Sequence, residues 1–305
     1  MVMTEMREDV TIMEISREEM IKMAVETRKK VTSSVVKQEE LDEYPVEIQV
    51  IKVPTRSGES TVYFSRSAKK DDAAPLVINL HGGGFIRERT ASDDLYCRKL
   101  VYGIGCKTLD VDYRVAPEFP FPTALYECYD VVQWAFSRGK ELGIDTSRIV
   151  LTGHSAGGNM VAGICMIAKA EKAFKPALAV LDYPPMDLLT DPDKKEARGG
   201  GIPVERARLY NLYYCEKEEQ ANYLASPVLA EEEQLKDFPR TLVITAGLDD
   251  LCNEAEAFAL KLAQAGNEVT LKRFPGASHG FTVYRMAEYE KAMELIVRFI
   301  KENVR

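Results

Sequence analysis

The chain has 305 residues, of which 46% are hydrophobic and 29% are charged, as in an ordinary globular protein. Forty Lys and Arg residues stand against 48 Asp and Glu, and the formal net charge of -8 argues against nucleic acid as a partner. The apolar stretch from Val161 to Ala168 is short, whereas a membrane span needs about 20 residues. The acidic N-terminus lacks the apolar segment of a secretory signal, so we expect a cytoplasmic protein.

Cysteine and histidine usage narrows the chemistry further. The six cysteines contain no CxxC pair, so they are interpreted as buried thiols of a cytosolic protein rather than as a disulfide framework or a zinc site. Only three histidines exist, and any mechanism that needs an imidazole must choose among His81, His154 and His279. Neither a metal nor a cofactor is expected.

The first forty residues are predicted to be helical and charged. Ser16 followed by Glu19 has the spacing of a capping box, which predicts a helix that begins at Ser16. The following apolar residues recur at helical spacing: Met20, Met23, Ala24, Thr27 and Val31. This helix either packs on the body of the protein or forms a lid over a pocket, and the sequence does not separate the two.

Beyond this helix, eight short apolar segments are predicted as strands, the first two joined by a turn at Ser57-Gly58. These segments are Val46 to Val53, Ser60 to Arg66, Leu76 to Leu80, Lys107 to Val111, Arg148 to Leu151, Ala177 to Leu181, Thr241 to Thr245 and Glu268 to Phe274. Helices are predicted at Ser92 to Tyr102, Pro122 to Arg138, Gly157 to Ala170, Glu254 to Ala265 and Arg285 to Ile300. The alternation predicts an α/β fold with a mostly parallel eight-stranded sheet, flanked by helices and edged by an antiparallel hairpin.

One segment breaks the alternation. Pro184 to Leu229 contains three glycines at 199–201 and an aromatic cluster of Tyr210, Tyr213 and Tyr214, but no clear strand. Because it lies between two predicted strands, we interpret it as an insertion over one end of the sheet.

The strongest motif is Gly153-His154-Ser155-Ala156-Gly157, which fits G-x-S-x-G. It follows a predicted strand and opens a predicted helix, the context in which a sharp turn lifts a serine hydroxyl above a sheet. Glycines at both ends avoid collisions with neighbouring backbone, and the helix start offers free N–H groups to an anion. Ser155 is therefore the candidate nucleophile, and an incidental serine in a tight turn is the lesser interpretation.

A second motif, His81 to Phe85, places three glycines directly after a predicted strand. Such a loop leaves backbone N–H groups uncovered and can direct them at a developing oxyanion. We assign the N–H groups of Gly83, Gly84 and Ala156 as donors, with His81 bracing the loop. No GK[ST] follows, which disfavours a phosphate-binding loop.

The general base and its acidic partner follow from the last two strands. His279 lies in PGASHGF between the last strand and the last helix, and it comes after the serine as the order Ser…Asp/Glu…His requires. Asp249 and Asp250 follow the strand at 241–245; Asp249 is chosen as the partner of His279, and Asp250 is expected to cap the next helix. Asp182 is a lesser rival.

Together, HGGGF, DYRVAPEFPFPTAL, GHSAGGN, AGLDDL and PGASHGF make the chain from about residue 75 onward resemble the hormone-sensitive lipase-like (bacterial family IV) carboxylesterases of the α/β-hydrolase superfamily. The family's triad falls on Ser155, Asp249 and His279. Its caps imply a division into 1–45 (N-terminal cap helices), 46–183 (core), 184–226 (cap insertion) and 227–305 (core). Two departures are visible: His154 replaces an Asp or small polar residue, and Asp250 replaces proline.

The resemblance implies a cofactor-independent serine esterase for small-molecule esters with short to medium acyl chains, and it allows a homodimer. Phe85, Tyr210, Tyr213 and Tyr214 are candidates to line the substrate pocket, although ordinary packing would explain them as well. Two family-pattern residues, Tyr113 and Glu118, are expected to shape the loop beside the glycine loop.

Two other functions stay open. An amidase or peptidase would use the same triad. A non-catalytic ligand-binding protein on the hydrolase scaffold is disfavoured because all three triad residues are present.

Overall fold

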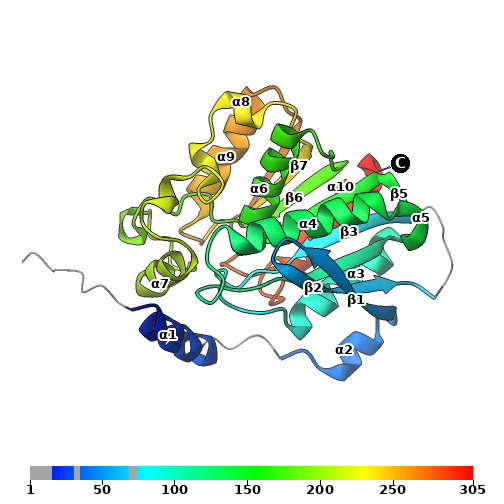
Figure 1. Ribbon diagram of the computed structural model, residues 1–305, viewed down its shortest axis with the longest axis horizontal. Coiled ribbons are helices and arrows are strands. Elements are labelled where there is room, and N and C mark those ends of the chain that lie inside the picture. Colours follow the sequence, from blue (N-terminus) through cyan, green and yellow to red (C-terminus); the bar gives the residue numbers. More distant parts are fainter. Residues whose placement is uncertain (1–15, 31–34, 69–73, 305) are drawn as a thin grey trace, which may run out of the picture.

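The computed structural model describes residues 16–30, 35–68 and 74–304, and its centre is one eight-stranded sheet (Figure 1). The strands are β1 (Glu47–Thr55), β2 (Gly58–Arg66), β3 (Ala74–Leu80), β4 (Lys107–Asp112), β5 (Ile144–His154), β6 (Leu178–Asp182), β7 (Arg240–Ala246) and β8 (Val269–Phe274). Their spatial order is β1-β2-β4-β3-β5-β6-β7-β8. The first two strands run antiparallel at one edge and the other six are parallel, as predicted.

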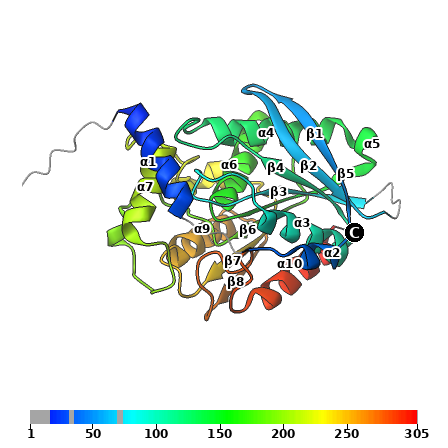
Figure 2. The same cartoon turned by 90° about the horizontal axis from the view of Figure 1, so that it is seen from below.

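Helices cover both faces of the sheet. They are α1 (Arg17–Lys30), α2 (Gln38–Asp42), α3 (Ala91–Ile104), α4 (Thr123–Ser137), α5 (Gly139–Leu142), α6 (Ala156–Glu171), α7 (Val204–Tyr214), α8 (Glu232–Leu235), α9 (Cys252–Gln264) and α10 (Tyr289–Asn303). Figure 2 shows α4 and α6 on one side of the sheet and α3 and α10 on the other. Each side has its own apolar core, because strands buried on both faces present side chains alternately to the two helix layers.

The strand order reverses between β3 and β5. The chain leaves β3 in one direction toward β4 and returns across β3 to β5, so the loops after β3 and β5 face each other at the carboxyl edge of the sheet. Ligands of open parallel sheets bind at such a switch point. The glycine loop follows β3 and the G-x-S-x-G motif follows β5, so both reach this position.

The segment between β6 and β7 lies over this edge, with α1 beside α7 in both views (Figures 1 and 2). Ser16 and Glu19 form the predicted capping box of α1. Ala24 is buried, whereas Met23 is 38% exposed, so the apolar stripe of α1 is narrower than expected; Val31 lies outside the described residues. Arg28 anchors the helix by donating to the carbonyls of Ile86 and Ala116.

Several boundaries differ from the expectation. Strand β5 is longer than predicted at both ends, and α10 begins four residues later, at Tyr289, because residues 275–288 form loop turns around the histidine. The insertion contains the full helix α7, which sequence periodicity did not reveal because its polar and apolar residues are mixed around the axis. Among the described residues, no helix is long and apolar enough to cross a membrane. All six cysteines are buried and unbridged.

Candidate active site

Ser155 occupies a sharp turn between β5 and α6. Its backbone lies at φ +52° and ψ −123°, a conformation that residues with a side chain rarely adopt. Neighbouring glycines make the turn possible: a Cβ on Gly157 would lie 1.9 Å from the Leu80 carbonyl oxygen, and one on Gly153 would lie 2.4 Å from the Gly157 backbone. The Ser155 N–H donates to the Asp182 carbonyl over 2.9 Å, which fixes the turn to β6.

The structure brings the three side chains of the expected triad together. Ser155 Oγ lies 2.9 Å from His279 Nε2, and His279 Nδ1 lies 2.7 Å from Asp249 Oδ2. They come from the loops after β5, β8 and β7, whose carboxyl ends share one edge of the sheet. Gly200, in the segment between β6 and β7, helps to position the backbone of His279. Its carbonyl accepts the His279 N–H at 2.8 Å, and its own N–H donates to the Leu248 carbonyl at 2.7 Å.

Electrostatics favour the charged form of His279. Burial acts to lower the pKa of this imidazole, but the charge and hydrogen bond of Asp249, with smaller contributions from Asp182 and Asp250, outweigh burial and leave the pKa raised. Asp249 is only 1% exposed, so water screens its charge weakly. The pair can therefore stabilise an imidazolium that forms when the serine loses its proton.

The glycine loop lies against the serine turn. A Cβ on Gly82 would lie 3.0 Å from the His154 carbonyl oxygen and 3.2 Å from Ser155 Cβ, so the approach requires glycine or a shift. Gly83 and Gly84 follow at φ +120° and +61°. Within the described chain, the N–H groups of Gly83, Gly84 and Ala156 donate to no protein acceptor.

His81 supports the glycine loop through its contacts with Gly82 and Tyr113. Its Nδ1 lies 2.8 Å from the Gly82 carbonyl, its own carbonyl accepts the Tyr113 hydroxyl at 2.7 Å, and the two rings stack at 4.0 Å. Burial lowers the pKa of His81, which favours a neutral ring. Glu118, the other loop residue named from the sequence, pairs with Arg28 of α1.

His154 forms a second Asp–His pair beside the nucleophile. Its Nε2 lies 2.9 Å from Asp93 Oδ1, and both side chains are buried. Burial acts to raise the pKa of Asp93, but the hydrogen bond and charge of His154 outweigh it and hold the pKa well below its usual range. The sequence did not point to Asp93 as a partner of His154, because its only local pattern is the spacing Thr90-x-x-Asp93, which is the capping box of α3.

Asp250 does not cap α9, contrary to the expectation. Leu251 precedes the first residue of that helix, and Asp250 Oδ1 instead accepts the Arg198 N–H of the insertion at 2.7 Å. The carboxylate of Asp182, the rival acid, accepts the Thr282 hydroxyl rather than His279. Burial raises the pKa of Asp182 to about 7.

Two cavities meet at Ser155. The smaller, about 40 Å³, is lined mostly by apolar side chains, including Leu188, Ile202, Val204, Ala207 and Leu251. The larger, about 220 Å³, is lined by both catalytic candidates Ser155 and His279 and by the glycine loop. Among the four aromatic candidates, Tyr210 lines both cavities and Phe85 lines the smaller one.

The other two aromatic candidates lie elsewhere. Tyr213 and Tyr214 are buried, line neither cavity, and belong to the apolar core. Tyr214 stacks on Phe85 with ring centres 3.6 Å apart, so it supports the cavity wall from behind.

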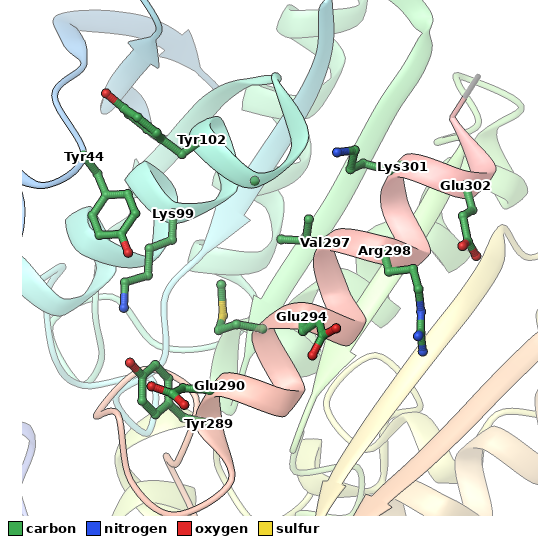
Figure 3. A pocket seen from close by; sticks show the side chains of 12 residues that line it. Tyr44, Lys99, Tyr102, Tyr289, Glu290, Glu294, Val297, Arg298, Lys301 and Glu302 are labelled. Atoms are coloured by element: carbon green, nitrogen blue, oxygen red, sulfur yellow. The ribbon is translucent and has the colours of Figure 1, made fainter.

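A larger groove of about 850 Å³ lies away from the triad, between α3 and α10 (Figure 3). Lys99 lies over the rings of Tyr44 and Tyr289, while Arg298 and Glu294 line the α10 side. The described residues that line it include no serine, cysteine or histidine, so it offers no nucleophile or imidazole base. Across the described part of the chain, no cluster of three or more His, Cys, Asp or Glu side chains is arranged to hold a metal ion.

A Ser–His–Asp arrangement at the carboxyl edge of a mostly parallel sheet defines an α/β hydrolase. A family model described as the alpha/beta hydrolase fold matches residues 77–283, and the chain belongs to this family. The arylesterase of Saccharolobus solfataricus is 34% identical over 68% of this chain and 68% of its own length. The ethyl acetate hydrolase of Pseudomonas putida is 28% identical over 84% of this chain and 83% of its own length.

Solved esterase structures superpose on this chain over most of its length. The hyperthermophilic esterase of Pyrobaculum calidifontis superposes with a TM-score of 0.80 at 28% identity, covering 94% of this chain and 92% of its own. A thermostable esterase from Pseudomonas putida superposes with a TM-score of 0.81 at 27% identity, covering 95% of this chain and 91% of its own. The expected kinship with hormone-sensitive lipase-like esterases and the expected fold are thereby confirmed.

Proposed function

We propose that this protein is a serine carboxylesterase with Ser155 as nucleophile, His279 as general base and acid, and Asp249 as the residue that orients and stabilises His279. The observation that carries the proposal is the continuous chain of contacts, 2.9 Å from Ser155 Oγ to His279 Nε2 and 2.7 Å from His279 Nδ1 to Asp249 Oδ2. Esterase names among the relatives support it.

In the first half of the reaction, Ser155 Oγ attacks the ester carbonyl while His279 Nε2 takes its proton. The carbonyl oxygen becomes an oxyanion, which the free N–H groups of Gly83, Gly84 and Ala156 bind. His279 then returns the proton to the alcohol oxygen, the C–O bond breaks, and the acyl group remains on Ser155.

In the second half, water attacks the acyl-enzyme. His279 accepts a proton from that water, the same N–H groups bind the second oxyanion, and the carboxylic acid leaves as His279 returns the proton to Ser155. No step needs a cofactor. Removing one oxyanion donor from such a site typically costs about 3–4 kcal/mol of barrier.

The cavity dimensions support short to medium acyl chains. The apolar cavity beside Ser155 is small and enclosed by insertion residues such as Leu188 and Val204, so it suits a short chain. Two finer proposals are a cytoplasmic location, expected from the sequence, and a homodimer, suggested by the family resemblance; cell fractionation and sedimentation equilibrium would test them.

The test is a series of aryl esters with acyl chains of increasing length, measured on wild type and on Ser155→Ala. We expect wild type to favour the shorter chains and Ser155→Ala to lose at least about 10³-fold in kcat, the scale of nucleophile removal in serine hydrolases. Matched aryl amides measure the amidase alternative. Equal turnover by Ser155→Ala would overturn the proposal.

A further inference from the structure

The larger cavity at Ser155 has a marked charge asymmetry. Two arginines line it, Arg87 after the glycine loop and Arg206 in α7, together with Tyr284. None of its lining residues, all within the described ranges, is Asp or Glu. This is unexpected in a chain whose acidic residues outnumber Lys and Arg by 48 to 40.

Neither arginine is neutralised by a partner. Arg87 Nη1 donates to the Tyr284 hydroxyl at 3.2 Å, and neither Arg87 nor Arg206 forms an ion pair with any residue in the described parts of the chain. Arg208, two positions further along α7, by contrast pairs with three carboxylates: Asp191, Asp193 and Glu205. Carboxylates therefore lie within reach of α7 at Arg208, whereas none lines the cavity beside Arg206.

Both arginines line the cavity that Ser155 and His279 also line. The Arg87 N–H donates to Gly83 O at 3.2 Å, and a Cβ on Gly83 would lie 2.7 Å from Arg87 Cβ, so Arg87 is packed on the oxyanion loop. Burial raises the pKa of Tyr210, and the charges of Arg206 and Arg87 oppose that effect. Arg87, Arg206 and Tyr210 all line this cavity.

The placement of His279 tells which half of an ester the cavity receives. His279 lines the larger cavity but not the smaller apolar one. Because His279 must protonate the leaving oxygen, the alcohol half lies on its side and the acyl chain enters the apolar cavity. The unpaired arginines thus face the alcohol half.

Resting on the proposed esterase function, we propose that Arg87 and Arg206 form an anion-binding subsite and that the preferred substrates are esters whose alcohol half bears a carboxylate. A planar guanidinium binds a carboxylate by paired, charge-assisted hydrogen bonds, and a partly enclosed cavity screens that attraction less than open water. Arg87 and Arg206 set specificity, whereas Ser155 and His279 carry the chemistry.

The test compares 3- and 4-carboxyphenyl acetate with the matched 3- and 4-carbamoylphenyl acetates. The readout is the ratio of kcat/KM for carboxylate over carboxamide. We expect this ratio to fall about tenfold in Arg87→Gln and in Arg206→Gln, the loss expected for one hydrogen bond between charged groups. Arg206→Lys keeps the charge but loses the paired hydrogen bonds, so the ratio should fall less than in Arg206→Gln. The wild-type preference should shrink at about 1 M salt.

Arg298→Gln is the matched control, because it removes an arginine from the distant groove lined by α10 and should leave both rates unchanged. Binding of uncleaved 4-carboxyphenyl acetate to Ser155→Ala, with and without Arg87→Gln, gives a second readout that needs no turnover; the added substitution should raise Kd about tenfold. Unchanged ratios and Kd in a protein that still hydrolyses the carboxamide esters would overturn the subsite alone. A wild type that cleaves no ester would overturn the proposed function, and the subsite with it.

Discussion

Replacing Asp249 by asparagine should disable the imidazole without altering the shape of the site. Asp249 Oδ1 accepts the Leu251 N–H at 3.2 Å, while Oδ2 faces His279 Nδ1 at 2.7 Å. An asparagine must keep its oxygen toward the fixed Leu251 N–H, so its NH₂ group turns to His279. The ring proton then moves to Nε2, which faces Ser155 Oγ and can no longer accept its proton.

The expected loss in kcat is about 10⁴-fold, the effect of the same change in serine protease triads, or about 5.5 kcal/mol of barrier. The pH profile should change as well. The Asp249 charge is the main factor that raises the pKa of His279 against the effect of burial. Without it the pKa falls, so the acid limb of the remaining activity should move to lower pH.

The assay is kcat/KM for an uncharged aryl ester across the pH range, with ¹⁵N NMR of the imidazole to read the tautomer. Asp250→Asn is the control, because that neighbouring carboxylate binds the Arg198 N–H instead of the ring, and its activity should stay within about tenfold of wild type. An Asp249→Asn enzyme that keeps a tenth of the activity, or whose acid limb moves to higher pH, would refute the reasoning.

Gly84→Ala should lower kcat/KM at least about 10²-fold, because its Cβ would lie 2.4 Å from the Tyr210 ring. Gly105→Ala, also at positive φ but facing open space, should cost only about 1 kcal/mol of unfolding free energy. Equal kcat/KM values for the two variants would contradict this prediction. Burial raises the pKa of Asp182 from 3.8 to about 7, so the neutral carboxyl contributes about 4 kcal/mol to stability at low pH, which is lost as pH rises from about 4 to 7. Asp182→Asn should flatten that dependence in urea unfolding, and an unaltered slope would contradict it. Arg28→Met should release α1 and speed limited proteolysis there; unchanged cleavage would show that its bonds to the core carbonyls do not hold the helix.

The three residues proposed as the triad could be placed near one another from the sequence because each has a local signature. Gly153 and Gly157 mark the sharp turn at Ser155, and Asp249 and His279 each lie in the loop that follows a strand, β7 and β8 respectively. Parallel strands end at one edge, so residues far apart in the sequence meet without any long-range information. Which of two adjacent carboxylates faces the imidazole was also predictable from proximity to the strand.

The segment between β6 and β7 could not be predicted to the same depth. Asp250 was expected to cap α9 because carboxylates favour that position, but the Arg198 N–H, 52 residues earlier, competes for it. Tyr213 and Tyr214 belong to α7 and are buried, while Tyr210 of the same helix faces the cavities. Which face of a weakly amphipathic helix is buried depends on tertiary packing rather than on periodicity.

We propose that Ser155 is a nucleophile activated by His279. Peptide mass spectrometry after treatment with a fluorophosphonate tests it most directly, in wild type and in His279→Ala. We expect a single stoichiometric adduct on Ser155 in wild type and labelling slower by at least about 10³-fold in His279→Ala. An adduct on another residue, or equal labelling rates in the two proteins, would contradict the account.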